Sequence, residues 1–227
     1  MKKLHKKLPF KKVHLPENPA ILLPLHAVVT VLVVESICRH SLIAGILFLF
    51  QHPYSFLVNA LIVGCSYSLA LLFRKQKSLL VLFMLFWLTL GIINGVILTF
   101  RVTPFTSSDL LLLKDGVNVA YKYLSLMALA ALVILLVLVI LVFAVLAFRI
   151  PAVKKRRKLS WSVTAILCTF LAAWGLILAG QKTELLETKF RELSQSYKKN
   201  GFLYCFGASL IDVGISRPDE YSTEAIE

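Results

Sequence analysis

Five long apolar segments constrain the fold of this chain more than any other feature of its sequence. A helix needs about 20 apolar residues to cross the ~30 Å hydrocarbon core of a bilayer. Segments of this kind occupy residues 19–36, 54–73, 78–100, 124–148 and 161–180. Hydrophobic residues make up 58% of the 227 residues and the mean hydropathy is +0.80, whereas soluble domains average about 45–50% apolar residues. We therefore predict an all-α integral membrane protein with five transmembrane helices.

The distribution of Lys and Arg predicts how these helices are oriented. Residues 1–18, 74–77 and 149–160 hold fifteen of the 25 basic residues but a single acidic one, Glu17. The positive-inside rule places these segments in the cytoplasm. Five crossings then put everything after residue 180 outside, where the sequence has six basic and eight acidic residues. The net charge of +13 thus reflects topology, so we expect anionic lipid as a partner and no nucleic acid.

Residues 37–53 join the first two predicted spans. Their apolar part, residues 41–50, would reach only about 15 Å as a helix, which is too short to cross. This segment therefore extends the first helix, re-enters the membrane, or lies along the outer interface, and all three paths stay open.

The segment 181–216 is predicted to form amphipathic helices on the outer membrane face, with a turn at Asn200 and Gly201. Apolar residues of its first helix, 183–197, recur at i, i+4, i+7 and i+11: Leu186, Phe190, Leu193 and Tyr197. A second stripe consists of Phe202, Cys205, Phe206, Leu210 and Val213. Residues 217–227 are polar and are interpreted as a linker toward a further domain.

Charged and polar residues gather at the ends of the predicted spans. Glu35 and Arg39 are four residues apart and could pair on one helical face, either as a structural bridge or as a headgroup contact. Thr106-x-x-Asp109 fits the capping signature of a short helix, so we interpret Asp109 as a cap in preference to a catalytic acid. Arg101 is interpreted as an interfacial anchor in preference to a ligand clamp.

These observations give five candidates for contact with lipid headgroups at the outer interface: Glu35, Arg39, Arg101, Thr103 and Asp109. Within the spans, Asn59 and Asn94 are predicted to form interhelical hydrogen bonds. The sequence contains no Gly-rich phosphate loop, no HExxH, no nucleophile elbow and no carboxylate cluster able to hold a metal. We therefore predict no catalytic residue, metal site or cofactor in this chain.

Four parts of the sequence carry a resemblance to a known family. In chain order they are VESICRHSL, PYSFLVNALIV, RVTPFTSSDLLLLKD, and YKKNGFLYCF followed by RPDEYSTEAI. Together they resemble the lipoteichoic acid synthase-like proteins of Gram-positive bacteria, which are sulfatase-related phosphoglycerol transferases. The residues that carry the resemblance are Glu35, Arg39, Phe56, Asn59, Arg101, Thr103, Pro104, Asp109, Asn200, Gly201, Phe202, Pro218, Tyr221 and Ser222.

The resemblance implies a five-helix membrane domain, helices along the outer face, and then a large extracellular α/β catalytic domain. In that domain a threonine nucleophile beside manganese moves phosphoglycerol from phosphatidylglycerol to a growing polymer. The sequence ends at Glu227, about where such a domain would begin, so no nucleophile or metal ligand is carried over. The chain is expected to be either an excised membrane portion or a natural short product.

The resemblance thus predicts a multi-pass domain of a bacterial cell membrane with its C-terminus outside. It would anchor and orient the catalytic domain and guide phosphatidylglycerol or polymer at the outer leaflet. One alternative is a regulatory or assembly partner of a related enzyme. A small lipid or ion transporter subunit is another, although such proteins carry internal repeats and paired broken helices that this sequence lacks.

Overall fold

The computed structural model describes residues 19–111, 159–187 and 193–211, and the helical positions 127, 134, 137 and 141. These residues form helices and turns without any β-strand. The predicted span at 124–148 lies outside the described residues except for the four single positions, and so do the segments 1–18 and 217–227.

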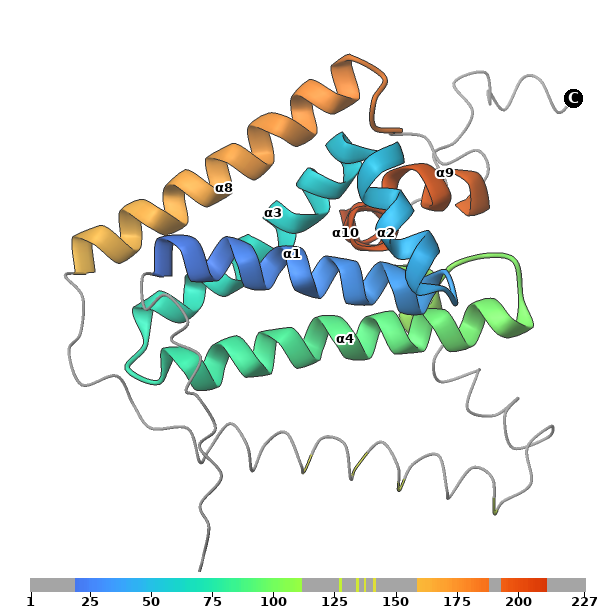
Figure 1. Cartoon of the computed structure of the whole chain (residues 1–227), viewed down its shortest axis with the longest axis horizontal. Helices are drawn as coiled ribbons and strands as arrows, with labels where there is room; N and C mark the ends of the chain where they lie inside the picture. Colours follow the sequence, from blue (N-terminus) through green and yellow to red (C-terminus); the bar gives the residue numbers. More distant parts are fainter. Residues whose placement is uncertain are drawn as a thin grey trace, which may run out of the picture.

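Four long helices form a bundle: α1 (Pro19–Cys38), α3 (Pro53–Leu69), α4 (Gln76–Phe100) and α8 (Leu159–Lys182). A short 3-10 helix, Ala70–Leu72, prolongs α3. Helices α1, α4 and α8 run in one direction and α3 runs in the other (Figure 1). The bundle therefore has one end where α1 and α4 finish and another where α3 finishes.

Three helical segments of the described chain are long and apolar enough to cross a membrane: Pro53–Leu72, Gln76–Phe100 and Leu159–Lys182. They coincide with three of the five predicted spans. Helix α1 covers the first predicted span, and its part Leu22–Cys38 is a shorter apolar helix. The described chain is thus helical, as predicted, with three helices that are compatible with a membrane protein.

Helix α1 packs against both α3 and α4. Its Thr30 shares a 2.7 Å hydrogen bond with the hydroxyl of Tyr67 on α3. Gly91 lets α4 approach α1 closely, because a Cβ there would lie 3.1 Å from Cγ1 of Val34. The small residue thus fixes the register of this helix pair, a common device of membrane bundles.

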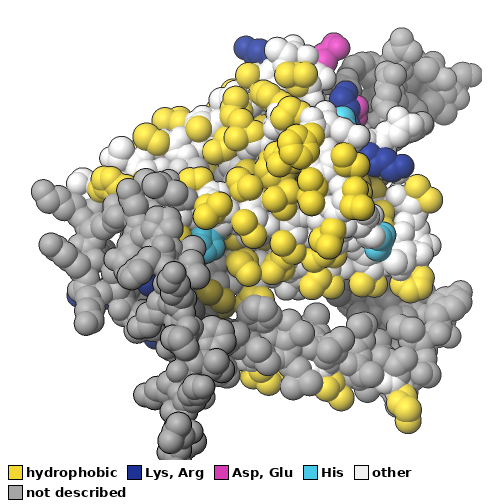
Figure 2. Space-filling model, viewed as in Figure 1, with side chains coloured by type: hydrophobic (Ala, Val, Ile, Leu, Met, Phe, Trp, Pro, Cys, Tyr) yellow, Lys and Arg dark blue, Asp and Glu magenta, His cyan; other side chains and the backbone are white. Residues whose placement is uncertain are grey.

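Helix α8 packs on α3 and leaves much of its apolar surface uncovered. Tyr54 at the start of α3 donates a 2.5 Å hydrogen bond to the carbonyl of Leu176, and Ser162 of α8 donates to the carbonyl of Leu71 at 3.3 Å. Phe170 and Trp174 are more than half exposed, and apolar side chains cover much of the face in Figure 2. A water-soluble monomer rarely exposes so large an apolar patch, whereas hydrocarbon would solvate it.

Residues 37–53 do not extend the first helix. The chain turns at His40, which has a φ of 52°, and begins a separate helix, α2 (Leu42–Gln51). Ser41 caps α2 by accepting a 3.3 Å hydrogen bond from the backbone N–H of Ala44. Gly45 then packs directly on Ser36 of α1. Of the three predicted paths, re-entry and an interfacial position both stay open.

The segment after α8 differs from the predicted helix over 183–197. Helix α8 ends at Lys182, Glu184 adopts a left-handed φ of 58°, and the Leu186 N–H bonds the carbonyl of Gly180 at 2.9 Å. This hydrogen bond closes the helix end. Leu186, predicted on the apolar stripe of that helix, is buried in the loop instead, and the next described helix is α9 (Leu193–Asn200). Phe190 lies outside the described residues.

The second tail helix, α10 (Phe202–Ile211), is not amphipathic in the predicted way. Its first five residues are all buried, Leu203 and Tyr204 included, because protein surrounds this half of the helix. Of the predicted stripe, Phe202, Cys205 and Phe206 are buried within the protein, Leu210 is half exposed, and Val213 lies outside the described residues. α10 contacts α3, α9 and the short helix α5 (Ser107–Leu111).

We call the end of the bundle that carries α2, α9 and α10 the tail end (Figure 1). The opposite end holds Arg74 and Lys75 between α3 and α4 and Lys77 in the first turn of α4, and it is called the basic end. The N-terminus of α8 also lies there, since Ser162 bonds the carbonyl of Leu71.

Candidate functional site

The tail end is organised around the buried carboxylate of Glu35. Its Oε1 accepts a 2.7 Å hydrogen bond from the backbone N–H of Phe202, and its Oε2 pairs with Nε of Arg39 at 3.0 Å. The predicted ion pair between Glu35 and Arg39 is confirmed. Because the first N–H groups of a helix lack partners within that helix, Glu35 serves as a cap for α10.

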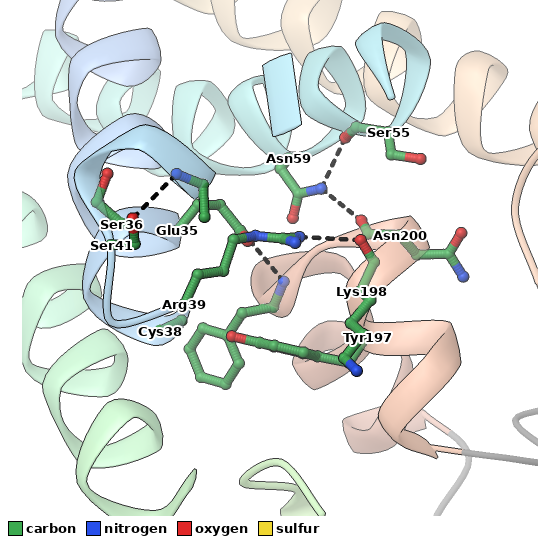
Figure 3. Close-up of polar contacts among 12 residues, drawn as sticks. Glu35, Ser36, Cys38, Arg39, Ser41, Ser55, Asn59, Tyr197, Lys198 and Asn200 are labelled. Atoms are coloured by element: carbon green, nitrogen blue, oxygen red, sulfur yellow. Dashed lines mark hydrogen bonds and ion pairs between the residues drawn. The ribbon is translucent and has the colours of Figure 1, made fainter. Parts of the chain in front are cut away.

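Asn59 makes a second attachment of the tail to the bundle. Its Oδ1 accepts from the N–H of Tyr204 at 2.8 Å. Figure 3 shows its Nδ2, which donates to the carbonyl of Asn200 at 2.7 Å. The same Nδ2 donates to the carbonyl of Ser55 at 2.6 Å. Asn59 was predicted to bond between spans, but its distant partners are backbone groups of the tail.

Gly201 makes this close docking sterically possible. Its φ of +83° is a conformation that L side chains rarely adopt. A Cβ at this position would lie 2.7 Å from Nδ2 of Asn59 and 2.9 Å from Oε1 of Glu35. The predicted turn at Asn200 and Gly201 is confirmed. It brings the two tail helices against the side chains of Glu35 on α1 and Asn59 on α3.

Asn94 on α4 joins the tail to the loop that follows α4. Its Nδ2 donates to the hydroxyl of Tyr197 at 2.8 Å, and its Oδ1 accepts from the backbone N–H of Phe105 at 2.8 Å. The ring of Phe105 stacks on that of Phe206, with centroids 5.5 Å apart. One buried amide therefore holds α9 and this loop in place.

Arg101 of the same loop forms a bidentate ion pair with Asp109 of α5, at 2.8 Å and 2.5 Å. Arg101 also donates to the carbonyl of Thr103 at 3.0 Å. Thr103 itself is exposed. Asp109 accepts from the N–H of Thr106 at 2.8 Å, as the capping signature predicted. The signature also predicts that the Thr106 hydroxyl accepts from a free backbone N–H, and this part is wrong. The hydroxyl instead donates to Asp109, because that carboxylate is the nearer strong acceptor.

The ionisation of Asp109 reflects these contacts. Partial burial disfavours the charged carboxylate, but the hydrogen bonds from Arg101 and Thr106 outweigh burial and lower the pKa of Asp109 below its ordinary value. Asp109 thus stays ionised at any physiological pH and holds the Arg101 guanidinium in a fixed position.

A cleft of about 570 Å³ opens at the tail end, between α9 and the ends of α1 and α4. Three basic residues line it, one from each of three segments: Arg39, Arg101 and Lys198. Apolar residues from the end of α4 and the following loop line it as well, namely Leu98, Phe100 and Val102. No acidic residue is among the described residues that line the cleft. It therefore offers positive charge beside an exposed apolar surface.

The three cations of the cleft differ in how their charge is balanced. Arg39 pairs with Glu35, donates to the carbonyl of Lys198 at 2.9 Å, and lies 4.4 Å from the centroid of the Phe48 ring. Arg101 is balanced by Asp109. Lys198 is exposed and has no acidic partner among the described residues. Among the described residues, the positive charge of the cleft that no carboxylate balances is therefore that of Lys198.

Lys199 provides a contrast to Lys198, its neighbour in the sequence. Its Nζ lies 3.5 Å from Oε1 of Glu187, and Lys199 does not line the cleft. Both lysines are exposed and lie in the last turn of α9, but only Lys198 lines the cleft. In the sequence both are simply basic residues of the tail, because nothing in the local pattern distinguishes them.

The predicted site residues fall into two connected groups. Glu35 and Arg39 of the first helix region meet Asn200, Gly201 and Phe202 of the tail in one network, although the two sets come from opposite parts of the chain. Figure 3 shows the contacts around Glu35, Arg39, Asn59 and Asn200. Thr103 and Asp109 surround Arg101, which reaches the same cleft as Arg39. Pro218 and Tyr221 lie outside the described residues.

The described residues contain no group of three His, Cys, Asp or Glu side chains placed to hold a metal ion. The four cysteines are free thiols: Cys38, Cys65, Cys168 and Cys205. The feature of this end that can act on a ligand is the cleft, whose basic side chains attract an anion. A scan of protein-family models and searches of curated proteins and of solved structures gave no match to this chain.

Proposed function

We propose that this chain is the membrane domain of a lipoteichoic acid synthase-like phosphoglycerol transferase. In this role it binds an anionic phospholipid, phosphatidylglycerol, at the outer leaflet of a bacterial cell membrane. It also anchors and orients a catalytic domain that follows the described tail. The observation that carries the proposal is the cleft shared by Arg39, Arg101 and Lys198.

The proposed orientation, five spans with the N-terminus inside and the C-terminus outside, rests on charge. Helices α1 and α8 begin at the basic end, where Arg74 and Lys77 lie, and in the sequence residues 1–18 and the basic cluster 149–158 come directly before these two helices. The positive-inside rule assigns that end to the cytoplasm, which leaves the cleft outside. Because α4 finishes at the tail end and α8 begins at the basic end (Figure 1), we place the fourth span between them, at 124–148.

The chemistry of the cleft suits a phospholipid headgroup. Phosphodiester oxygens are strong acceptors, and a fixed guanidinium or ammonium offers charge-assisted hydrogen bonds to them. The apolar residues beside the cations, Phe100 and Val102, are largely exposed and would lie against acyl chains. A free anion would use the cations alone, whereas a lipid uses both surfaces.

The docked tail supports the anchoring part of the proposal. Glu35, Asn59 and Asn94 each fix α9 or α10 through buried hydrogen bonds. A domain attached after α10 would therefore begin from a defined direction at the outer face. A flexible tail would hold such a domain near the membrane but would not orient it.

Native mass spectrometry of the detergent-purified chain tests the lipid role. The protein is offered phosphatidylglycerol and phosphatidylcholine with matched acyl chains, and retained lipid is counted. We expect preferential retention of phosphatidylglycerol, reduced several-fold by Lys198→Gln and unchanged by Lys199→Gln. Equal retention of the two lipids by the unaltered protein would contradict the proposed lipid binding and leave only the anchoring role.

A further inference from the structure

The cleft lies at a seam between two parts of the molecule that attach separately. One wall belongs to the bundle, through Arg39 at the end of α1 and Arg101 after α4. The other wall belongs to α9, through Ser194, Tyr197 and Lys198. A ligand that touches both walls therefore contacts groups that are far apart in the sequence and come together only when the tail is docked.

We infer that an anionic, phosphate-bearing ligand in the cleft controls the docking of the tail, so that headgroup binding and attachment of α9 and α10 to the bundle stabilise each other. This inference rests on the proposed function, since it concerns the same cleft. It adds a regulatory role: the tail is held firmly when the cleft is occupied and more loosely when it is empty.

The charges of the two walls carry the inference. Lys198 brings to the seam a positive charge that has no acidic partner among the described residues, whereas Arg101 on the opposite wall is balanced by Asp109. In the empty cleft the described residues therefore give Lys198 no counter-ion. A phosphate between the two walls supplies that counter-ion and also lies beside the guanidinium groups of the bundle wall, so it favours the docked arrangement. By linkage, a ligand that binds the docked tail more tightly shifts the tail toward docking by the same factor.

The structure supplies a direct reporter of docking. The amides of Phe202 and Tyr204 lie in the first turn of α10, where backbone N–H groups have no acceptor within the helix. Their acceptors are the side chains of Glu35 and Asn59, at 2.7 Å and 2.8 Å. Both amides are therefore protected from hydrogen exchange by docking itself and exchange when the tail detaches.

The test compares exchange of these two amides in nanodiscs of phosphatidylcholine alone and in nanodiscs that also contain phosphatidylglycerol. We expect about tenfold slower exchange with phosphatidylglycerol if that lipid is present at roughly ten times its Kd. Lys199→Gln should keep the slowing and Lys198→Gln should abolish it. A third arm adds soluble glycerol phosphate to phosphatidylcholine discs: slowing there assigns the ligand as a free phosphate, and its absence assigns it as the lipid.

Two outcomes would overturn the inference. One is equal exchange in both lipid mixtures while native mass spectrometry still finds phosphatidylglycerol retained, which leaves the proposed lipid binding intact. The other is fast exchange of Lys198→Gln already in phosphatidylcholine, which would make Lys198 a structural part of docking. Failure of the protein to prefer phosphatidylglycerol at all would instead count against the proposed function.

Discussion

The carboxylate of Glu35 accepts a hydrogen bond from the backbone N–H of Phe202, 167 residues further along the chain, at 2.7 Å. This contact joins the first helix of the bundle to the last described helix. An acidic side chain at a helix N-terminus also interacts favourably with the helix dipole. Helices α9 and α10, the described helices of the tail, are therefore part of the packed bundle.

Removing the Glu35 carboxylate should destabilise the bundle strongly. Glu35→Ala leaves the Arg39 guanidinium, whose side chain is only 16% exposed, without its partner, and the Phe202 N–H without an acceptor. Breaking a buried ion pair costs about 3–5 kcal/mol. Thermal unfolding in detergent should show this loss, with Glu184→Gln, a change in the loop after α8, as the near-neutral control. Similar unfolding temperatures for the two variants would show that the tail does not depend on Glu35.

Two glycines of the tail should respond in opposite ways to the same substitution. Gly201→Ala places a methyl group against Asn59 and Glu35 in a left-handed conformation, and the conformation alone costs about 1–2 kcal/mol. Gly207→Ala meets nothing within 4 Å and should stabilise α10 by about 0.5–1 kcal/mol. Unfolding temperatures of the two variants provide the comparison. A Gly201→Ala protein as stable as the wild type would contradict the docked geometry.

Substitutions at two buried polar residues should differ in cost, because one side chain has hydrogen-bond partners and the other has none among the described residues. Asn59→Leu leaves the Tyr204 N–H and the Asn200 carbonyl without partners and should cost about 2–4 kcal/mol. The hydroxyl of Ser78 is buried but has no hydrogen-bond partner among the described residues. Ser78→Ala should thus be neutral or slightly stabilising. Proteolysis of the folded protein at increasing temperature would rank the two variants, and the reverse ranking would refute this assignment.

The pair of Arg101 and Asp109 should give stability that depends on pH. The pKa of Asp109 is lowered in the folded protein, so its contribution is complete above the ordinary Asp value of about 3.9 and disappears as pH falls through the lower folded value. Arg101 is 40% exposed, and screening by water limits the contribution to about 1 kcal/mol.

This pH dependence is measured by comparing the wild type with Asp109→Asn in thermal unfolding. The difference between them should be constant from pH 7 to about pH 5 and shrink below about pH 4. A difference that instead grows at acidic pH would mean that Asp109 is not held in its charged form.

The sequence predicted the long helices because their signal is local. Apolar runs such as 78–100 and 161–180 are set by composition alone, and the helices Gln76–Phe100 and Leu159–Lys182 match them within two residues. The pairing of Glu35 with Arg39 was also predictable, since i, i+4 neighbours on a helix face each other.

The docking of the tail was not predictable from the same signals. Phe202 and Cys205 suggest a helix on a membrane surface, because an apolar stripe is the same whether lipid or protein covers it. Asn59 suggests a partner on another span, and only the fold shows that this partner is the turn at Gly201. Lys198 is a candidate binding residue because it lines the same cleft as Arg101. The two residues lie in distant segments, so only the fold brings them together.

Labelling of single cysteines in intact cells tests most directly the claim that the cleft faces the exterior. Lys198→Cys reports on the cleft and Arg74→Cys on the basic end, each compared with the unaltered chain, whose four native cysteines set the background. With a membrane-impermeant maleimide, we predict labelling of Lys198→Cys in intact cells and of Arg74→Cys only after permeabilisation. Labelling of Arg74→Cys in intact cells, with Lys198→Cys protected, would contradict the orientation and the function proposed from it.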